Sequence, residues 1–237
     1  IQDYRLRAKR QEQLSVVSVP DTSLQQYFGN LGGPIIKDKL WFFLSDDFFG
    51  NSDKSSQHSI GWLTVPGGER RVSTNNVFGK ITFTPFENHT LSLSGTLDKF
   101  LHQSGGIGVP EAYTKTTYTR YSYRLNYRGI LSQNTLLTLA WGQNRNDTNT
   151  QPLSGNFGPP SYLWQDIGQT TNNAFYSDHS LEHRTDVAIG LMHYLDLGRW
   201  GNHEIKAGVS YYRNKYNEVC HMTGLDADPW PGNWFDN

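Results

Sequence analysis

The sequence has no long apolar stretch. None of its 237 residues lies in a window of about 18 or more apolar residues, the length that a membrane-spanning helix needs. A membrane-spanning β-strand needs only about 9 to 11 residues, so it leaves no such window. This absence excludes a transmembrane helix and leaves open strands that cross a bilayer.

Cysteine and a surplus of charge of one sign are also missing. The single Cys220 cannot form an internal disulfide, which excludes a disulfide-stabilised scaffold. The 21 basic and 22 acidic residues nearly balance, so the chain has no positive field that would collect nucleic acid. We therefore expect no nucleic-acid partner.

Aromatic residues and glycine are abundant instead. Tyr, Phe and Trp make up 14% of the chain and glycine occurs 23 times, whereas methionine occurs twice. This composition is typical of β-structure rather than of helices, and it predicts an all-β fold.

From Val72 onward, apolar and polar residues alternate along several segments, which is the signature of a strand with two different faces. The alternation marks residues 77–84, 91–98, 120–128, 137–142, 186–191 and 205–212. Charges gather on the polar faces. The apolar faces are therefore predicted to meet lipid, among them Leu91, Leu93, Val187, Ile189, Leu191 and Val209.

Short and long connections alternate along the chain. The short ones lie at Lys37–Lys39, Pro85–His89, Ser132–Asn134 and Asp196–Asn202, and the long ones span about Gly50–Arg71, Leu101–Thr116 and Asp147–Ser180. Outer-membrane barrels have short periplasmic turns and long extracellular loops. The pattern predicts an antiparallel meander of about eight long strands, part of a transmembrane β-barrel, over residues 1–237 with no internal domain boundary.

The N-terminal region is less regular. The segments Tyr4–Arg10 and Gln13–Val19 suit either strand or loop, Leu24–Leu31 is weakly patterned, and Leu40–Leu44 is apolar on both faces. The facing of these segments stays open. The first residue is Ile1 with no apolar signal segment, so we expect an excerpt of a longer protein.

A hairpin is predicted at residues 28–43. Two β-prone runs meet at the polar turn Lys37-Asp38-Lys39, and the returning strand opens with Trp41, Phe42 and Phe43, like the aromatics at a membrane interface. The wording Leu-Gly-Gly-Pro-Ile-Ile-Lys-Asp-Lys-Leu-Trp-Phe-Phe from Leu31 to Phe43 closely resembles the first part of the barrel in TonB-dependent outer-membrane receptors of the Oar-like group.

The resemblance implies a role as well as a fold. In that family a barrel of about 22 strands encloses an N-terminal plug, and TonB delivers energy from the inner-membrane proton gradient. Residues 1–237 would be a partial barrel domain, with the plug and the remaining strands elsewhere in the protein. The implied function is TonB-dependent ligand uptake in the bacterial outer membrane. The implied partners are outer-membrane lipid, TonB through the N-terminal region of the full protein, and an unidentified extracellular ligand.

No motif predicts a metal site. His179 and His183 have the spacing of a zinc helix, but along a strand they would lie roughly 13 Å apart, too far to share one ion. Cys220-His221 lacks a second ligand pair, and Asp226-Ala227-Asp228 lacks the other ligands of a calcium loop.

No motif predicts catalysis either. The loop Ser104–Pro110 imitates a phosphate loop without the required Lys-Ser/Thr pair, and no Gly-x-Ser-x-Gly elbow occurs. Asp46, Asp47 and Glu111 could form a carboxylate pair only if the fold brought them together. We expect no enzyme, no cofactor and no catalytic residue, and the ligand-binding residues stay unknown.

Two groups of side chains have alternative interpretations. Arg120, Arg124 and Arg128 share a strand face, which would be a solvated surface in water or the lining of a barrel lumen. The loop aromatics would either stack on a sugar or chelate, or pack and anchor the loops. They include Trp62, Tyr113, Phe157, Tyr162, Trp164, Trp230 and Trp234.

Two rival proteins fit parts of this pattern. One is a soluble all-β carbohydrate-binding module whose apolar faces form a sandwich core, and the other is a small enzymatic outer-membrane barrel. Within the barrel interpretation, Leu24–Ile36 could pair with Glu204–Tyr216 and close a small barrel, or both edges could stay open. We expect the open, curved sheet.

Overall fold

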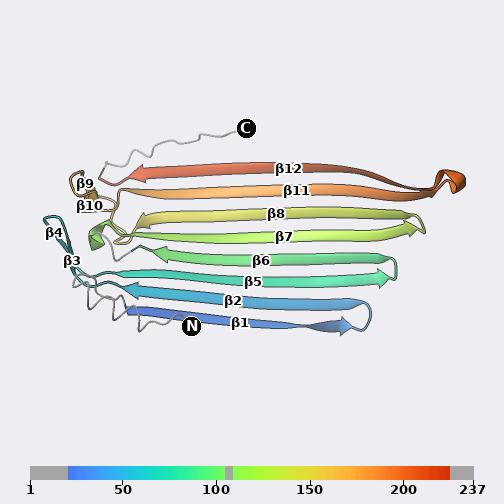
Figure 1. Ribbon diagram of the computed structural model, residues 1–237, viewed down its shortest axis with the longest axis horizontal. Helices are drawn as coiled ribbons and strands as arrows, with labels where there is room; N and C mark the ends of the chain where they lie inside the picture. The colour runs from blue at the N-terminus through green and yellow to red at the C-terminus, as the bar shows by residue number, and fades with distance from the viewer. Residues whose placement is uncertain (1–20, 105–108, 225–237) are drawn as a thin grey trace.

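The computed structural model describes residues 21–104 and 109–224, and it contains one large antiparallel sheet (Figure 1). Its eight strands follow chain order: β1 (Asp21–Ile36), β2 (Leu40–Lys54), β5 (Glu69–Phe86), β6 (His89–Gln103), β7 (Thr114–Ser132), β8 (Thr135–Pro152), β11 (Tyr176–Asp196) and β12 (Asn202–Met222). The predicted all-β meander of eight long strands is confirmed. The segments Tyr4–Arg10, Gln13–Val19 and Asp226-Ala227-Asp228 lie outside the described residues.

Short turns and long connections lie at opposite ends of the sheet (Figure 1). The long-connection end also carries two small hairpins, β3 (His58–Ile60) with β4 (Leu63–Val65), and β9 (Tyr162–Trp164) with β10 (Gln169–Thr171). Two 3-10 turns complete the described elements, η1 (Pro110–Ala112) at the long-connection end and η2 (Gly198–Trp200) at the short-turn end. The predicted placement of the connections is confirmed.

The strands extend further toward the long connections than the sequence predicted. β2 continues to Lys54, β8 continues to Pro152, and β11 begins at Tyr176. These ends carry polar residues on both faces, so they show no alternation. The backbone ladder needs no apolar side chain, which is why the strands continue where the sequence pattern fades.

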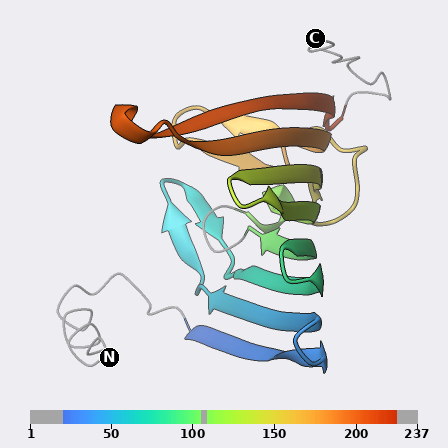
Figure 2. The same cartoon turned by 90° about the vertical axis from the view of Figure 1, so that its right-hand side faces the viewer.

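The sheet is a single layer. Seen from the short-turn end, its strands lie side by side in one curved layer, and among the described residues no second large sheet packs against it (Figure 2). Among the described residues, the buried hydrophobic side chains Val65, Val109, Tyr113 and Ala174 all belong to the long-connection end. Ile189, in the middle of β11, is 50% exposed. A sandwich core, as the soluble carbohydrate-binding alternative requires, does not form within residues 21–104 and 109–224.

No helix formed by the described residues has the length and hydropathy to cross a bilayer.

The ladder register assigns each side chain to a face, because directly opposed residues point to the same side. Val187 lies in one row with Tyr211, Trp141, Leu125, Leu93 and Ile81. Ile189 lies in the next row of this face with Val209, Leu139, Tyr127, Leu91 and Phe83. We call these two rows, together with Leu191, the apolar band. The six residues predicted to meet lipid therefore share one face.

The apolar band crosses the strands obliquely. On β2 it ends toward the short turn at Leu40, which lies in the row of Ile189 and Val209. On β12, apolar residues of the same face extend past the band to Ile205, four residues beyond Val209. A row of paired residues runs across the strands at right angles to them. Barrel strands are tilted in the membrane, so a band parallel to the membrane plane passes obliquely from one row to the next. The shift of the apolar residues along the strands between β2 and β12 therefore agrees with a wall of tilted barrel strands.

The register also settles the facing of the first hairpin. Phe42 and Leu44 lie on the face of the band, and Phe43 lies on the opposite face, opposite Gly32. A Cβ on Gly32 would approach the Phe43 ring to 3.0 Å and the Phe42 carbonyl oxygen to 3.1 Å. Glycine in the Leu31–Phe43 motif thus allows the aromatic strand to pack closely.

β1 and β12 occupy the two edges of the sheet, and within residues 21–104 and 109–224 each pairs on one side only. The small closed barrel, in which Leu24–Ile36 would pair with Glu204–Tyr216, does not form among the described residues. The open sheet expected from the sequence is observed instead.

Replacing Ile189 with arginine should impair folding into lipid vesicles, because a cation near the bilayer midplane costs about 2 to 4 kcal/mol. Ala188→Arg is the matched control, since Ala188 points to the polar face opposite Ser210 and Ala140. A change at Gly190 is less suitable because a Cβ there would lie 2.7 Å from Thr138 Oγ1. Urea unfolding in vesicles measures both variants, and an equal loss would contradict the assignment of faces.

Candidate functional site

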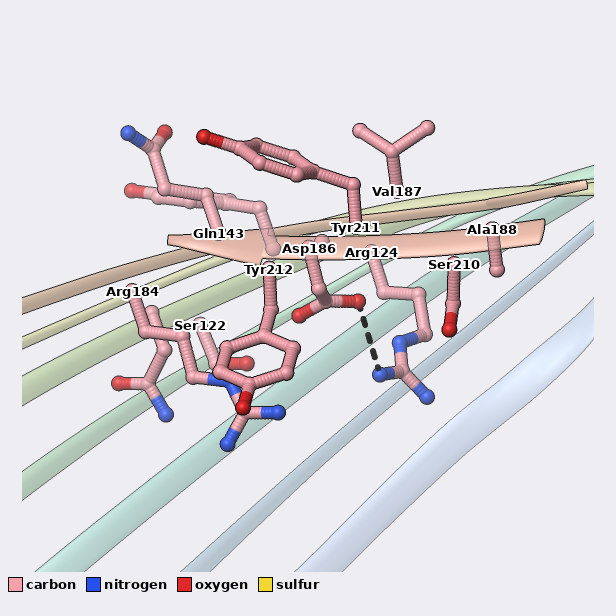
Figure 3. Close-up of a pocket in the computed structure, with 13 residues that line it drawn as sticks. Ser122, Arg124, Gln143, Arg184, Asp186, Val187, Ala188, Ser210, Tyr211 and Tyr212 are labelled. Atoms are coloured by element: carbon pink, nitrogen blue, oxygen red, sulfur yellow. Dashed lines mark ion pairs between the residues drawn. The ribbon is translucent and has the colours of Figure 1, made fainter. Parts of the chain in front are cut away.

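The face opposite the apolar band carries a polar hollow of about 460 Å³ over β7, β8, β11 and β12. Arg124, Arg184 and Asp186 extend into it from one side of the sheet, together with Ser122, Ser210 and Tyr212 (Figure 3). Val187, Gln143 and Tyr211 border it through their strands, but their side chains point to the other side (Figure 3). The hollow is therefore a feature of the polar face alone.

An ion pair crosses the hollow above a glycine. Asp186 on β11 and Arg124 on β7 lie in one row with Gly142 of β8 between them. Their closest atoms, Arg124 Nη2 and Asp186 Oδ2, are 3.6 Å apart. A Cβ on Gly142 would lie 2.8 Å from both oxygens of the Asp186 carboxylate. The missing side chain thus gives the carboxylate room to reach across β8.

Two more arginines on this face lie against tyrosine rings. The guanidinium carbon of Arg184 is 5.6 Å from the centre of the Tyr212 ring, and that of Arg120 is 5.7 Å from the centre of the Tyr118 ring. Both contacts are within the range of cation–π attraction. The tyrosine rings thus hold both guanidinium groups without neutralising them.

The prediction that the three arginines of β7 share one face of the strand is confirmed. Arg120, Arg124 and Arg128 lie opposite Asp98, Ser94 and Thr90 of β6. One oxygen of Asp98 and one of Asn146, on either side of Arg120, are buried without a hydrogen-bond partner among the described atoms. Buried acceptors of this kind are suited to a donor from outside the described chain, such as water or another protein segment.

The loop aromatics divide into packed and exposed residues. Tyr113 is only 5% exposed and would meet any Cβ on Gly68, so it packs the long-connection end. The Trp62 and Trp164 rings meet edge to face at 5.0 Å, which brings the β3–β4 and β9–β10 hairpins together. The Trp62 indole N–H also donates to the Asp166 carboxylate at 2.9 Å. Phe157 and Tyr162 are exposed, whereas Trp230 and Trp234 lie outside the described residues.

The histidines and the free cysteine serve other contacts. His179 pairs with Asp147 at 3.0 Å, and His183 lies 2.6 Å from the Gln143 amide nitrogen. Within residues 21–104 and 109–224, no three His, Cys, Asp or Glu side chains come together as a metal site. Cys220 is a free thiol in β12.

The other candidate groups are dispersed. Asp46 and Asp47 are consecutive in β2 and so point to opposite faces, while Glu111 lies in η1. Ser104 bonds Thr114 across the ends of the 104–113 connection, and residues 105–108 of the glycine-rich loop lie outside the described chain. The carboxylates are therefore not arranged as a catalytic pair.

The pKa of Glu69 is lowered at the long-connection end of β5, beyond the apolar band. The Arg71 guanidinium donates to Glu69 at 2.9 Å and the Ser52 hydroxyl donates at 2.6 Å. These bonds, that of Arg71 first, hold the pKa of Glu69 at about 2, below its ordinary 4.5. The interaction favours the folded strand above pH 4.5 and is lost as the pH falls toward 2.

Sequence reasoning missed the partners of the arginine row. Asp186, Gly142 and Tyr212 are distant from Arg124 in sequence and meet only through the register of four strands. The alternation of apolar and polar residues correctly assigned these three residues to the polar face. Only the relative shift of the strands shows that they share a row.

The sequence matches no protein-family model and no curated protein. Among solved structures, the fold is similar to that of the outer membrane transporter YddB from Escherichia coli, with a TM-score of 0.70 and 11% sequence identity. The similarity covers 85% of this chain and 27% of the transporter chain. This chain therefore spans about a quarter of that transporter's length, and it has the fold of a segment of an outer-membrane β-barrel.

The Arg124–Asp186 pair should show a small, salt-sensitive coupling energy, below about 1 kcal/mol, because the Arg124 side chain is 59% exposed. Arg124→Gln, Asp186→Asn and the double variant form the cycle, measured by urea unfolding in vesicles. The control cycle replaces Arg124→Gln with Arg128→Gln, four residues along β7 and without a contact to Asp186. Equal coupling in the two cycles would contradict the pair.

Proposed function

We propose that the chain is a segment of the barrel wall of a TonB-dependent outer-membrane receptor, located in the bacterial outer membrane. One observation carries this proposal: a single-layer, eight-stranded sheet with an apolar band on one face and an arginine-bearing polar face on the other. Hydrocarbon offers the backbone no water, so only a hydrogen-bonded ladder with an apolar outer face can cross it.

The first hairpin supports the link to TonB. Residues 31–43 resemble the start of the barrel in Oar-like receptors, and the structure forms a hairpin there, with its turn at Lys37–Lys39 and Gly32 against Phe43. On this proposal residues 1–237 are a partial barrel domain. TonB engages the N-terminal region of the full protein, and a plug occupies the lumen.

The polar face would line that lumen. Arg120, Arg124, Arg128 and Arg184 provide donors, while Asp98 and Asn146 provide acceptors without described partners. Such groups suit contact with water, a plug or a passing polar ligand. The role proposed is binding and passage, without catalysis and without a cofactor.

The long connections would face the cell exterior and take part in ligand capture. They carry the Trp62–Trp164 pair and the exposed Tyr162. Flat aromatic faces stack on sugars and on other ring-shaped ligands. The identity of the ligand is left open by this chemistry.

Cysteine labelling on intact cells tests the orientation in the full receptor. In a Cys220→Ser background, Ser154→Cys in the long connection should react with an impermeant thiol reagent, and Asn134→Cys in a short turn should not. The background change removes a native thiol whose pKa is raised by burial and then by Asp178 and Glu218. Labelling at residue 134 but not at 154 would overturn the proposed orientation.

A further inference from the structure

A cluster of basic side chains lies on the face of the sheet that carries the apolar band, just beyond the band toward the long connections. Arg145 of β8, His183 of β11 and Lys215 of β12 are direct neighbours in one row. Arg213 lies two residues along β12 on the same face. We call these four residues the outer basic cluster. It faces away from the polar hollow and is not used by the proposed transport function.

Three residues of the cluster, Arg145, His183 and Lys215, line a hollow of about 760 Å³. Arg213 lies outside this hollow, in the next row on the same face toward the apolar band. Tyr121 and Tyr123 border it toward β7, and Leu181 and Asn217 border it toward the long connections. The wall thus combines cationic groups with aromatic and aliphatic surface. A ligand that suits it carries negative charge beside an apolar part.

The positive charge of the cluster is not neutralised by the described residues around it. Arg145, Arg213 and Lys215 form no ion pair within residues 21–104 and 109–224. Asp147 also lines the hollow, and its carboxylate lies 3.0 Å from His179 Nε2. Glu182 also borders the hollow, but it lies on the polar face and its carboxylate accepts a hydrogen bond from Asn214. At least three cations are therefore available to an anion.

The position of the cluster matches the headgroup level of a membrane. Its row lies four residues beyond the row of Val187, Trp141 and Tyr211, which is about 13 Å along a strand and about 9 Å in height at a tilt near 45°. Measured from Ile189, near the bilayer midplane, the row of His183 and Lys215 lies six residues away, about 20 Å along a strand and about 14 Å in height. This is just over half of an apolar band about 25 Å tall, so the row lies at the level of the phosphates. Arginine and lysine at this depth attract anionic headgroups by about 1 kcal/mol each.

We propose that the outer basic cluster binds the phosphate of an anionic lipid in the leaflet facing the long connections. The phosphate lies in the hollow between Arg145 and Lys215, with Arg213 beside it toward the band, and the acyl chains lie along the apolar band. Guanidinium and ammonium groups form charge-assisted hydrogen bonds with phosphate oxygens. The inference rests on the proposed function, because it needs this face to contact lipid.

Retention of phosphatidic acid by the detergent-purified full receptor tests the proposal, with phosphatidylcholine and inorganic phosphate as comparison ligands in native mass spectrometry. The wild type should retain phosphatidic acid in preference to phosphatidylcholine. The Arg145→Gln/Lys215→Gln variant should bind it roughly tenfold to thirtyfold more weakly, as expected for two lost cation contacts. Added salt should weaken retention by the wild type.

The matched control is Lys37→Gln/Lys39→Gln, which removes the same charge from a short turn at the other end of the sheet. It should bind phosphatidic acid like the wild type, and gel mobility before and after heating checks that both variants fold. Equal losses in the two variants would overturn a localised site. Displacement by inorganic phosphate at the concentration of the lipid would show an anion site in place of a lipid site.

These outcomes separate the two proposals. Retention in micelles does not depend on the orientation of the receptor in a cell. Loss of the lipid preference with the cysteine labelling pattern intact would overturn the lipid site alone, whereas a reversed labelling pattern would overturn the proposed function.

Discussion

The register of the hydrogen-bonded ladder is the constraint on which the rest of the structure depends. In a single-layer sheet the position of a side chain relative to lipid or lumen is decided by its parity along the strand and by nothing else. A slip of one residue between β8 and β11 would bring Asp186 to the apolar band and Val187 to the polar hollow. The apolar band, the arginine row and the outer basic cluster therefore all follow from the same set of pairings.

The same constraint explains the two open edges. β1 and β12 each have one set of backbone groups directed away from the sheet, and hydrocarbon leaves such groups without a partner. A membrane-spanning wall, as proposed, would therefore need further strands beside them. The similarity to a transporter chain of which the sheet covers 27% agrees with a sheet that is one part of a larger barrel.

The sequence allowed the fold class and the faces of the regular strands to be predicted. Around Val187, Ile189 and Leu191 the alternation is strict, as expected if one face meets lipid along the depth of a membrane, which is the proposed location. The end of β8 could not be predicted, since residues beyond the band are polar on both sides. In the first hairpin, Phe42 and Phe43 face opposite sides although both are apolar, so composition alone could not assign them.

The candidate sites were less predictable than the strands. Spacing along β7 placed Arg120, Arg124 and Arg128 on one face, but the partners of Arg124 belong to other strands. Arg145 and Lys215 are 70 residues apart and become neighbours only through β11. Sites of this kind depend on the relative shift of strands, which a sequence pattern does not contain.

Site-directed spin labelling tests the central claim most directly. Nitroxides attached in turn at residues 186 to 191 of the full receptor in lipid bilayers report their exposure to oxygen, which concentrates in hydrocarbon, and to a water-soluble nickel complex. If the apolar band meets lipid, oxygen maxima are expected at residues 187, 189 and 191 and nickel maxima at residues 186, 188 and 190. The opposite phase, or no period of two, would contradict it.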